Sequence, residues 1–316
     1  MTTLHNQDIL RADQFSKEEV GLIMDTARAF EQDLQAGKVL STMNGQVLAT
    51  LFFEPSTRTR LSFESAMLRL GGGVITVADS KSSSAAKGES LPDTIKTVEG
   101  YADLIVLRHP QIGSAEQAAA ATERPILNAG DGAGQHPTQS LLDLYTIQKE
   151  KGTPDGLTIS LAGDLKNGRT VHSLVDLLSS FNVKFYFVAP TALRMPEAIV
   201  ARLKNRGIEV TETESLEQAL AVSDVLYMTR IQRERFSDPA EYERLKGAYV
   251  LNRALVSKAK EGLTIMHPLP RVNEIATDVD DYSGAAYFRQ VANGIPVRMA
   301  LLALVAGRAS LERYPL

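Results

Sequence analysis

The sequence predicts an α/β protein of two doubly wound domains, each a mostly parallel sheet flanked by helices, with a cleft between the domains. The chain has 316 residues, and at about 150 residues per domain this length suggests two domains. Short apolar runs typical of buried strands alternate with stretches of helical period, an order that favours βαβ units. Nine such runs fit two sheets better than one.

The nine runs that we interpret as strands are short and apolar, and four of them lie in the first half of the chain. They are residues 47–53, 74–78, 104–107, 125–128, 157–162, 184–188, 208–211, 225–228 and 263–266. A polar stretch at residues 149–156, with two glycines and a proline, indicates a boundary between the domains.

Two helices are marked near the ends of the chain. Residues 16–35 begin with a capping-box pattern of Ser16 and Glu19, which apolar residues follow at helical spacing. Residues 297–305 are predicted to form the last helix, with Gly307 near its end.

Composition and charge exclude several classes of protein. Lys and Arg total 34 against 38 Asp and Glu, so the formal charge of −4 offers no basic excess for nucleic acid or an anionic membrane. The absence of cysteine excludes disulfides, thiolate nucleophiles and iron–sulfur clusters. The first eight residues lack the pattern of a secretory signal, so we expect a cytoplasmic protein.

Familiar cofactor and metal sequences are missing. There is no Walker phosphate loop, no Gly-x-Gly-x-x-Gly after the first strand and no His-Glu-x-x-His zinc helix. We therefore predict no cofactor and no bound metal.

Hydroxyl and guanidinium groups follow the first strand, where Ser56, Thr57, Arg58 and Thr59 lie in a polar turn before a helical stretch. The free N–H groups and positive dipole at a helix start, together with these donors, suit a dianionic phosphate. Alternatively, Ser56 is only an N-cap and the arginines are solvated. Arg60 is two positions from Arg58 and points to another face, so we interpret it as structural.

A glycine-rich loop, residues 128–136, follows the fourth strand. Its glycines allow the backbone to approach a ligand closely. Pro137 suits the first helical position, which puts His136 at the cap and Gln139 three residues on, so both can face the crevice at the strand ends. The alternative is a histidine with a purely structural role.

Three more arginines, Arg108, Arg169 and Arg230, follow predicted strands. Ligands of open α/β sheets bind outside the carboxyl ends of the strands, so these arginines together predict a site for a small polyanion. Each one alone would be interpreted as a surface or ion-pair arginine.

Two further segments are unusual. Residues 79–90 are too polar for a core element and predict a mobile loop, in which Lys87 alone would be interpreted as solvated. Residues 267–271, His-Pro-Leu-Pro-Arg, follow the last strand. Their prolines fix an irregular backbone that can aim carbonyl oxygens at a substrate amide or amine, or that simply makes a rigid turn.

Taken together, these motifs resemble those of the aspartate and ornithine carbamoyltransferases. Residues 56–60 resemble the family's carbamoyl phosphate signature, and residues 136–139 resemble its second signature. The resemblance covers essentially the whole chain. It implies a carbamoyl phosphate-binding domain of residues 1–137 plus 293–316 and an aspartate-binding domain of residues 138–292.

The second domain favours the aspartate type. Ornithine enzymes carry a cysteine where Pro268 stands here and a Ser-Met-Gly motif that this sequence lacks. Arg169, Arg230 and Gln232 match the aspartate type, because a dicarboxylate needs cationic partners that ornithine would repel. The implied reaction, a step of pyrimidine biosynthesis, moves the carbamoyl group of carbamoyl phosphate to the α-amine of L-aspartate.

The resemblance also implies a role for each matched residue. The implied catalytic residues are Arg58, Thr59, Arg108, His136 and Lys87. The implied carbamoyl phosphate ligands are Ser56, Thr57, Arg58, Thr59, Arg108, His136, Gln139, Leu269 and Pro270, with a cis Leu269–Pro270 bond. The implied aspartate ligands are Lys87, Arg169, Arg230 and Gln232. Lys87 and Ser84, or Ser83 in its place, would enter the site of an adjacent subunit.

The shared loop implies a homotrimer, for which regulatory chains or a dihydroorotase are candidate partners. The nearest alternative is a carbamoyltransferase for ornithine or another amino acid. An alternative from a different class is a non-catalytic two-lobed anion-binding protein. A nicotinamide dehydrogenase is disfavoured by the missing glycine fingerprint.

Overall fold

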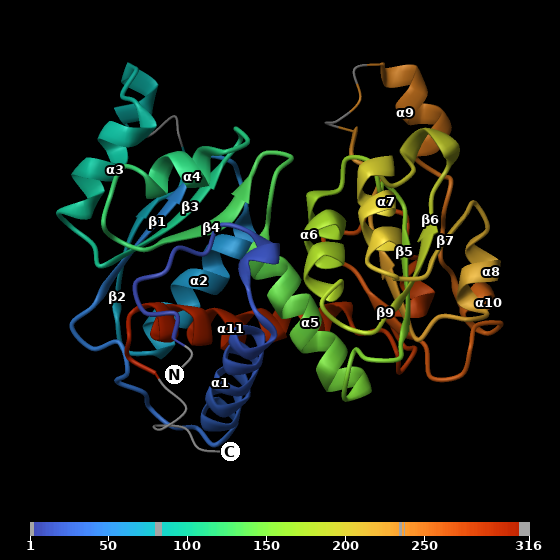
Figure 1. Ribbon diagram of the computed structural model, residues 1–316, viewed down its shortest axis with the longest axis horizontal. Helices are drawn as coiled ribbons and strands as arrows, with labels where there is room; N and C mark the ends of the chain where they lie inside the picture. The colour runs from blue at the N-terminus through green and yellow to red at the C-terminus, as the bar shows by residue number, and fades with distance from the viewer. Residues whose placement is uncertain (1–2, 80–83, 234–235, 237, 310–316) are drawn as a thin grey trace. The chain divides into compact units, whose positions relative to one another are not determined.

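The chain folds into two compact units (Figure 1). The structure, a computed structural model, describes residues 3–79, 84–233, 236 and 238–309. Unit 1 comprises Met1–Leu142 with Asn293–Leu316, and unit 2 comprises Asp143–Ala292. The divisions fall inside helices α5 (Pro137–Lys151) and α11 (Tyr287–Val305), so each of these helices contributes residues to both units.

The sheet of unit 1 has four parallel strands in the order β2-β1-β3-β4. The strands are β1 (Val47–Phe52), β2 (Gly73–Val77), β3 (Leu104–His109) and β4 (Ile126–Asp131). The other elements wholly within the unit are η1 (Ala12–Gln14), α1 (Lys17–Gln35), α2 (Thr57–Arg69), η3 (Ser84–Lys87), α3 (Leu91–Glu99) and α4 (Ser114–Ala119).

Alternating side chains of this sheet pack against different helices. Ala49 and Leu51 of β1 face a core that includes Ile95 of α3 and Ala118 of α4. Thr50, between them in sequence, points to the other face and donates a hydrogen bond to Glu64 of α2 at 3.1 Å. Helices therefore cover both faces of the sheet, which is why its central strands are almost wholly buried.

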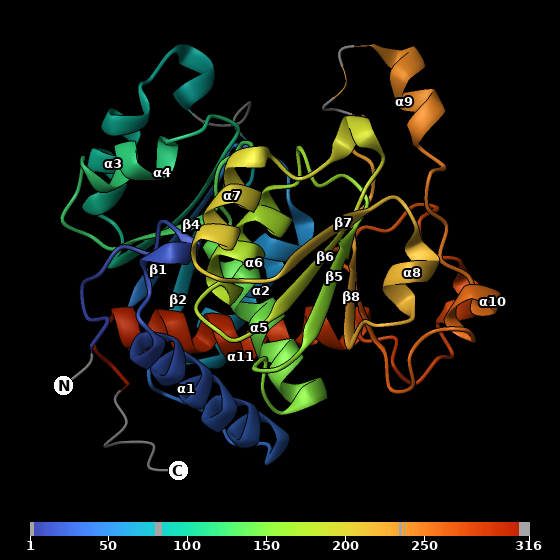
Figure 2. The same ribbon diagram turned by 45° about the vertical axis from the view of Figure 1, so that its right-hand side comes forward.

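The sheet of unit 2 has five parallel strands in the order β7-β6-β5-β8-β9. Figure 2 labels β7, β6, β5 and β8 of this sheet. The strands are β5 (Thr158–Ala162), β6 (Lys184–Val188), β7 (Val210–Thr213), β8 (Val225–Met228) and β9 (Thr264–Met266). The other elements wholly within the unit are α6 (Arg169–Leu178), η4 (Thr191–Leu193), α7 (Glu197–Asn205), α8 (Leu216–Leu220), α9 (Pro239–Leu245), α10 (Arg253–Val256) and η6 (Thr277–Val279).

The two predicted sheets are confirmed, and all nine predicted strands are found. Strands 184–188 and 225–228 have the predicted bounds, and the other seven differ by one to three residues at one or both ends. The largest shift of a strand start is in β7, which begins at Val210 rather than at Ile208. Gly207 adopts a positive φ of 77° and the Ile208 N–H bonds to the Leu203 carbonyl, so these residues close the end of α7 instead of joining the sheet.

The last helix is longer than predicted. It begins at Tyr287, ten residues before the predicted start, and it contains Pro296. Proline cannot donate to the carbonyl four residues earlier, which is that of Ala292, and such a loss usually ends a helix. Here the helix continues through the proline, and the missing bond coincides with the division between the units at Ala292 and Asn293.

The predicted start of the first long helix is confirmed. Ser16 caps α1 by accepting from the Glu19 N–H, and the Glu19 carboxylate accepts from the Ser16 N–H. No helix in the described part of the chain is long and apolar enough to cross a bilayer.

The order of the strands predicts one ligand-binding position at the strand ends of each sheet. In unit 1 the chain leaves β1 for β2 on one side and returns to β3 on the other side of β1. In unit 2 it leaves β5 for β6 and β7, and returns to β8 beside β5. Such a reversal separates the loops that leave the two central strands, and ligands of doubly wound sheets bind there.

Candidate active site

The turn from β1 to α2 places the expected phosphate donors at a helix start. Ser56 is the N-cap residue, and its hydroxyl makes no capping hydrogen bond within the described part of the chain. Thr57 and Arg58 are exposed at the first turn, while Thr59 is buried. Arg60 instead lies 3.9 Å from Glu64, one helical turn on. The turn therefore presents hydroxyls, a guanidinium and the positive end of the helix dipole together.

Arg108 is held rigidly at the end of β3. Its register against β4 shifts between Leu107 and His109, a local irregularity of the kind that redirects side chains near active sites. The buried guanidinium donates to the Ala129 carbonyl and to the Glu54 carboxylate, both at 3.1 Å. Glu54 follows β1, so an ion pair joins the ends of the two strands that flank the reversal.

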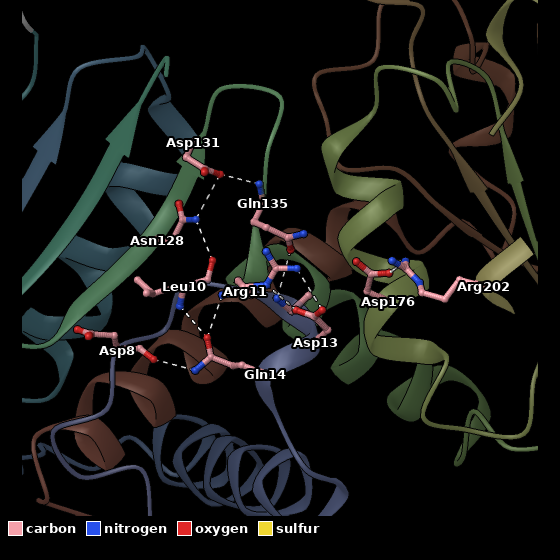
Figure 3. Close-up of polar contacts among 11 residues, drawn as sticks. Asp8, Leu10, Arg11, Asp13, Gln14, Asn128, Asp131, Gln135, Asp176 and Arg202 are labelled. Carbon is pink, nitrogen blue, oxygen red and sulfur yellow. Dashed lines mark hydrogen bonds and ion pairs between the residues drawn. The ribbon is translucent and has the colours of Figure 1, made fainter. Parts of the chain in front are cut away.

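The glycine-rich loop after β4 folds around the buried carboxylate of Asp131. That carboxylate accepts from the backbone N–H of Gln135 and from the Asn128 amide (Figure 3). It also accepts from the backbone N–H of Gly113. A Cβ on Gly134 would lie 2.7 Å from the carboxylate oxygens, so only glycine fits there. Hydrogen bonds to this one carboxylate thus hold the conformation of the loop.

The loop delivers His136 and Gln139 to the start of α5. Pro137 is the first residue of the helix, as predicted, and His136 immediately precedes it. His136 is buried, Gln139 is half-buried, and the His136 carbonyl accepts from the Ser140 N–H. The His136 backbone is therefore held by the first turn of α5.

Lys87 lies away from these groups in the chain, at the end of the short helix η3. It is exposed, and Ser84 begins the same short helix. Ser83 lies outside the described residues.

In unit 2, the loop after β5 positions Arg169 through another buried carboxylate. Asp164 accepts from the backbone N–H and the side-chain amide of Asn167, at 3.0 and 3.1 Å. Gly168 caps α6, and a Cβ there would lie 2.7 Å from the Asp164 carbonyl oxygen. Arg169 follows as the first residue of the helix and is buried.

Arg230 and Gln232 follow β8, the partner of β5 at the reversal in unit 2. Both are half-buried. Thr229 anchors the start of this segment, because its N–H bonds to the Ala162 carbonyl of β5. Arg169 and Arg230 thus leave neighbouring strands at the same edge of the sheet.

The turn after β9 contains the cis Leu269–Pro270 bond that the resemblance implies. Burial, and more weakly the positive charges of Arg271 and Arg230, lower the pKa of His267 at the start of this turn. Arg230 therefore lies close enough to the turn to act on it electrostatically. Leu269 has a φ of 55°, a left-handed conformation that its neighbours must hold in place.

The expected site residues consequently fall into two groups. Unit 1 brings Ser56, Thr57, Arg58, Thr59, Arg108, His136 and Gln139 to the strand ends of one sheet. Unit 2 brings Arg169, Arg230, Gln232, Leu269 and Pro270 to the strand ends of the other. Among the described residues, no group of three or more His, Asp and Glu side chains could hold a metal ion.

Sequence reasoning did not identify the acidic residues that hold the cationic and irregular segments. They are Glu54, Asp131, Asp164 and Glu274. A usable signal existed for Asp131 and Asp164, because each lies beside a glycine directly after a predicted strand, where a carboxylate commonly ties a loop. Glu54 and Glu274 carry no local signal, because their partners are distant in sequence or meet them only in the folded turn.

Two family models match the chain. "Aspartate/ornithine carbamoyltransferase, carbamoyl-P binding domain" matches residues 7–149, and "Aspartate/ornithine carbamoyltransferase, Asp/Orn binding domain" matches residues 155–305.

Curated relatives agree with these models. The aspartate carbamoyltransferase catalytic subunit of Thermococcus kodakarensis is 56% identical over 95% of this chain and 97% of its own length. The catalytic subunit of Methanocaldococcus jannaschii is 58% identical over 90% and 93%.

Solved structures are similar over the same length. Aspartate transcarbamoylase from Trypanosoma cruzi, in complex with carbamoyl phosphate and aspartate, superposes with a TM-score of 0.91 at 44% identity, covering 96% of this chain and 97% of that one. The M. jannaschii catalytic subunit gives 0.88 at 55% identity, covering 94% and 97%.

Proposed function

The chain belongs to the aspartate/ornithine carbamoyltransferase family, and from that premise we propose that it carbamoylates L-aspartate. The reaction consumes carbamoyl phosphate and releases N-carbamoyl-L-aspartate and phosphate, a step of pyrimidine biosynthesis in the cytoplasm. The proposal rests chiefly on the arginines that lie at the strand ends of both sheets: Arg58 and Arg108 in unit 1, and Arg169 and Arg230 in unit 2. The chain is also similar throughout its length to aspartate carbamoyltransferases.

Unit 1 is assigned to carbamoyl phosphate. Its α2 start offers hydroxyl and N–H donors as well as Arg58, a set suited to a phosphate dianion. Arg108 reaches this region from β3 and is already aligned by Glu54 and Ala129. In this assignment Ser56, Thr57, Arg58, Thr59 and Arg108 bind the phosphate, and Arg108, His136 and Gln139 contact the carbamoyl group.

Unit 2 is assigned to L-aspartate. Two carboxylates need two cationic partners, and Arg169 and Arg230 leave neighbouring strands at one edge of the sheet. Gln232 adds a neutral donor, and Lys87 is assigned to the same substrate from an adjacent subunit. The carbonyl oxygens of Leu269 and Pro270 are assigned to the carbamoyl amide.

The chemistry follows from where charge develops. The neutral α-amine attacks the carbonyl carbon, negative charge grows on the carbonyl oxygen, and phosphate departs with the electron pair of the broken C–O bond. Phosphate can accept the proton that the amine loses. Arg58, Thr59, Arg108 and His136 stabilise the oxygen and the leaving group, and one such donor typically lowers the barrier by about 3 to 4 kcal/mol.

Assembly as a homotrimer completes the proposal. Lys87 is exposed on η3, where a neighbouring copy could receive it. Leu61 and Leu68, seven residues apart on α2, are exposed by 52% and 62%, so one face of this helix presents apolar side chains that a neighbouring copy could cover. Regulatory chains or a dihydroorotase are further candidate partners.

Turnover by the purified chain tests the reaction. Carbamoyl phosphate is supplied with L-aspartate or with L-ornithine, and the carbamoylated product and phosphate are measured. We expect product with aspartate and, at equal concentration, less than about a hundredth as much with ornithine, because the site's cations repel it. Equal or faster turnover of ornithine would contradict the assignment of unit 2, and phosphate binding without turnover would favour a binding protein.

Mixed trimers test the shared loop. Lys87→Ala and Arg58→Ala chains, each nearly inactive alone, are mixed, dissociated and reassociated, and the mixed composition is verified by native mass spectrometry. Sites made from one intact Arg58 and one intact Lys87 should recover part of the activity. Hybrids of verified composition that stay inactive would exclude sharing.

A further inference from the structure

The turn after β9 is closed on itself by the buried side chains of His267 and Glu274. The Nδ1 atom of His267 accepts from the Leu269 N–H at 2.8 Å. Its Nε2 atom lies 2.7 Å from the Glu274 carboxylate, which also accepts from the N–H groups of Val272 and Asn273 at 3.1 Å. Both ends of the eight-residue segment 267–274 are therefore tied to one imidazole ring.

This arrangement leaves the middle of the turn without hydrogen-bond donors. Pro268 and Pro270 have no N–H group, and the N–H of Leu269, between them, is bonded inward to His267. Among the described residues, no backbone N–H group donates to the carbonyl oxygens of these three residues. Residues 268–270 thus present acceptors only, and a ligand that meets them must supply N–H donors.

The backbone of His267 is anchored by buried amide and carboxylate side chains of unit 2. Its backbone N–H donates to the Gln290 side chain at 2.9 Å, and Gln290 donates to Asp143 at 2.6 Å. The remaining oxygen of Asp143 accepts from the Tyr227 hydroxyl of β8 at 2.8 Å. These side chains are at most 1% exposed, so the backbone from which the turn begins is fixed from within the unit.

We propose that His267 is a positioning residue that keeps residues 268–270 free of donors, so that the site selects the carbamoyl amide by its N–H groups. Rotation of the Leu269 peptide would replace an acceptor by a donor and remove that selection. The inference rests on the proposed function, because it takes carbamoyl phosphate as the ligand of this turn. It assigns the selection to His267 and Glu274, which do not touch the ligand.

The protonation state of the ring is consistent with this role. Nδ1 can accept from Leu269 only if it carries no proton, which leaves the proton on Nε2 facing Glu274. Burial lowers the pKa of His267 against the opposing effect of Glu274, and the charges of Arg271 and Arg230 lower it further. The neutral ring is therefore the form present at pH 7.

Acetyl phosphate isolates the contribution of the turn, because a methyl group replaces the amide and cannot donate. Dissociation constants of carbamoyl phosphate and acetyl phosphate are measured for the full-length protein and for two variants. His267→Leu removes the acceptor for the Leu269 N–H. His267→Asn keeps one, since an asparagine oxygen readily accepts from the N–H two residues on. Inorganic phosphate, which lacks the carbamoyl group, is the control ligand.

In His267→Leu, the preference for carbamoyl over acetyl phosphate should fall about tenfold, the effect of losing one well-aligned hydrogen bond. Affinity for inorganic phosphate should change less than about threefold. His267→Asn should keep the preference within about threefold of the original protein. A folded leucine variant with an unchanged preference would overturn the inference, as would an asparagine variant that loses it tenfold.

The proposed function and the role of His267 can fail separately. If the unmodified protein does not carbamoylate aspartate, the proposed function fails. If it does so and the carbamoyl-to-acetyl preference is insensitive to His267, only the role of this histidine fails. Should His267→Leu not fold, the carbamoyl-to-acetyl preference of His267→Asn still tests the inference, because a tenfold loss in that variant would overturn it.

Discussion

Units 1 and 2 place similar residues at equivalent strand ends and differ in the loops around them. β1, β3 and β4 of unit 1 occupy the same order as β5, β8 and β9 of unit 2, with the reversal between the first two strands in both. A helix with an arginine in its first turn follows the first strand, and another arginine ends or follows the second. A buried histidine follows the third strand: His136 in unit 1 and His267 in unit 2.

The difference lies in what the loop after the third strand offers. In unit 1 the loop is glycine-rich, wraps around Asp131 and leads into α5. In unit 2 the loop is proline-rich, and its side-chain acceptor is a histidine ring that Glu274 holds. Strand order thus determines where a ligand can bind, while the residues of the loops determine whether donors or acceptors meet it.

The largest expected effect is a loss of activity when Arg58, at the start of α2 in unit 1, is replaced. Arg58→Ala should lower kcat about 100- to 1000-fold, because a charge-assisted donor to the developing negative charge is removed. The exposed side chain leaves folding intact, which thermal unfolding would verify. Arg60→Ala, two residues on, is the matched control and should stay within about threefold, since Arg60 pairs with Glu64. Equal losses of kcat in Arg58→Ala and Arg60→Ala would contradict the assignment of Arg58, and not Arg60, to the phosphate.

The next largest effect is a loss of stability when Asp131, whose carboxylate lies inside the glycine-rich loop, is replaced. Asp131→Ala should lower the free energy of unfolding by about 3 kcal/mol, because it leaves the half-buried N–H groups of Gln135 and Gly113 without their acceptor. Urea denaturation measures this change. Asp13→Ala, which breaks an exposed pair with Arg11, should change the same quantity by less than about 0.5 kcal/mol. An Asp131 variant as stable as the control would show that the loop does not depend on this charge.

In unit 2, Arg230→Ala should raise the KM for aspartate about 100-fold, the effect of losing an arginine–carboxylate pair. The dissociation constant of inorganic phosphate should stay within about threefold, because its ligands are assigned to unit 1. Arg233→Ala is the control, since this exposed arginine lies three residues further along. A KM for aspartate unchanged by loss of Arg230 would exclude its assignment to a carboxylate.

The smallest effect is a pH dependence in unit 2. Burial lowers the pKa of His172, whose Nε2 lies 2.7 Å from the Leu165 carbonyl. Because the folded pKa is below the unfolded value of about 6.5, the unfolded state binds more protons between the two values. The resulting stability is fully present above about pH 6.5 and is lost as pH falls towards the folded pKa.

His172→Gln keeps a donor for Leu165 and removes the titration. Between pH 7 and pH 5, the free energy of unfolding should fall less in this variant than in the unmodified protein, because the variant lacks the group whose pKa is lowered on folding. Equal falls in the two proteins would show that His172 does not contribute to the acid sensitivity.

Strand positions were predictable because a buried parallel strand has a nearly continuous apolar run, as in Val225–Met228. The placement of Arg58, Arg108 and Arg169 at strand ends followed from those runs and from the binding rule for doubly wound sheets. The start of α11 was not predictable from local residues, because Pro296 ordinarily interrupts a helix and here does not.

The residues that orient the site were harder to find from sequence. Glu54 meets Arg108 from 54 positions away, and such a pair exists only once β1 and β3 lie side by side. His267 and Glu274 are near each other in the chain, but their contact depends on a turn with a positive φ at Leu269. Periodicity and spacing describe elements well, whereas contacts between loop side chains depend on the folded backbone.

The central claim is that unit 1 binds the phosphate and unit 2 the dicarboxylate. The most direct measurement is a crystal structure of this protein with N-(phosphonacetyl)-L-aspartic acid, which joins both groups in one molecule and is bound in a T. cruzi relative. The account predicts the phosphonate at Ser56–Thr59 and Arg108, and the carboxylates at Arg169 and Arg230. A phosphonate bound by Arg169 and Arg230, or carboxylates bound at the start of α2, would contradict it.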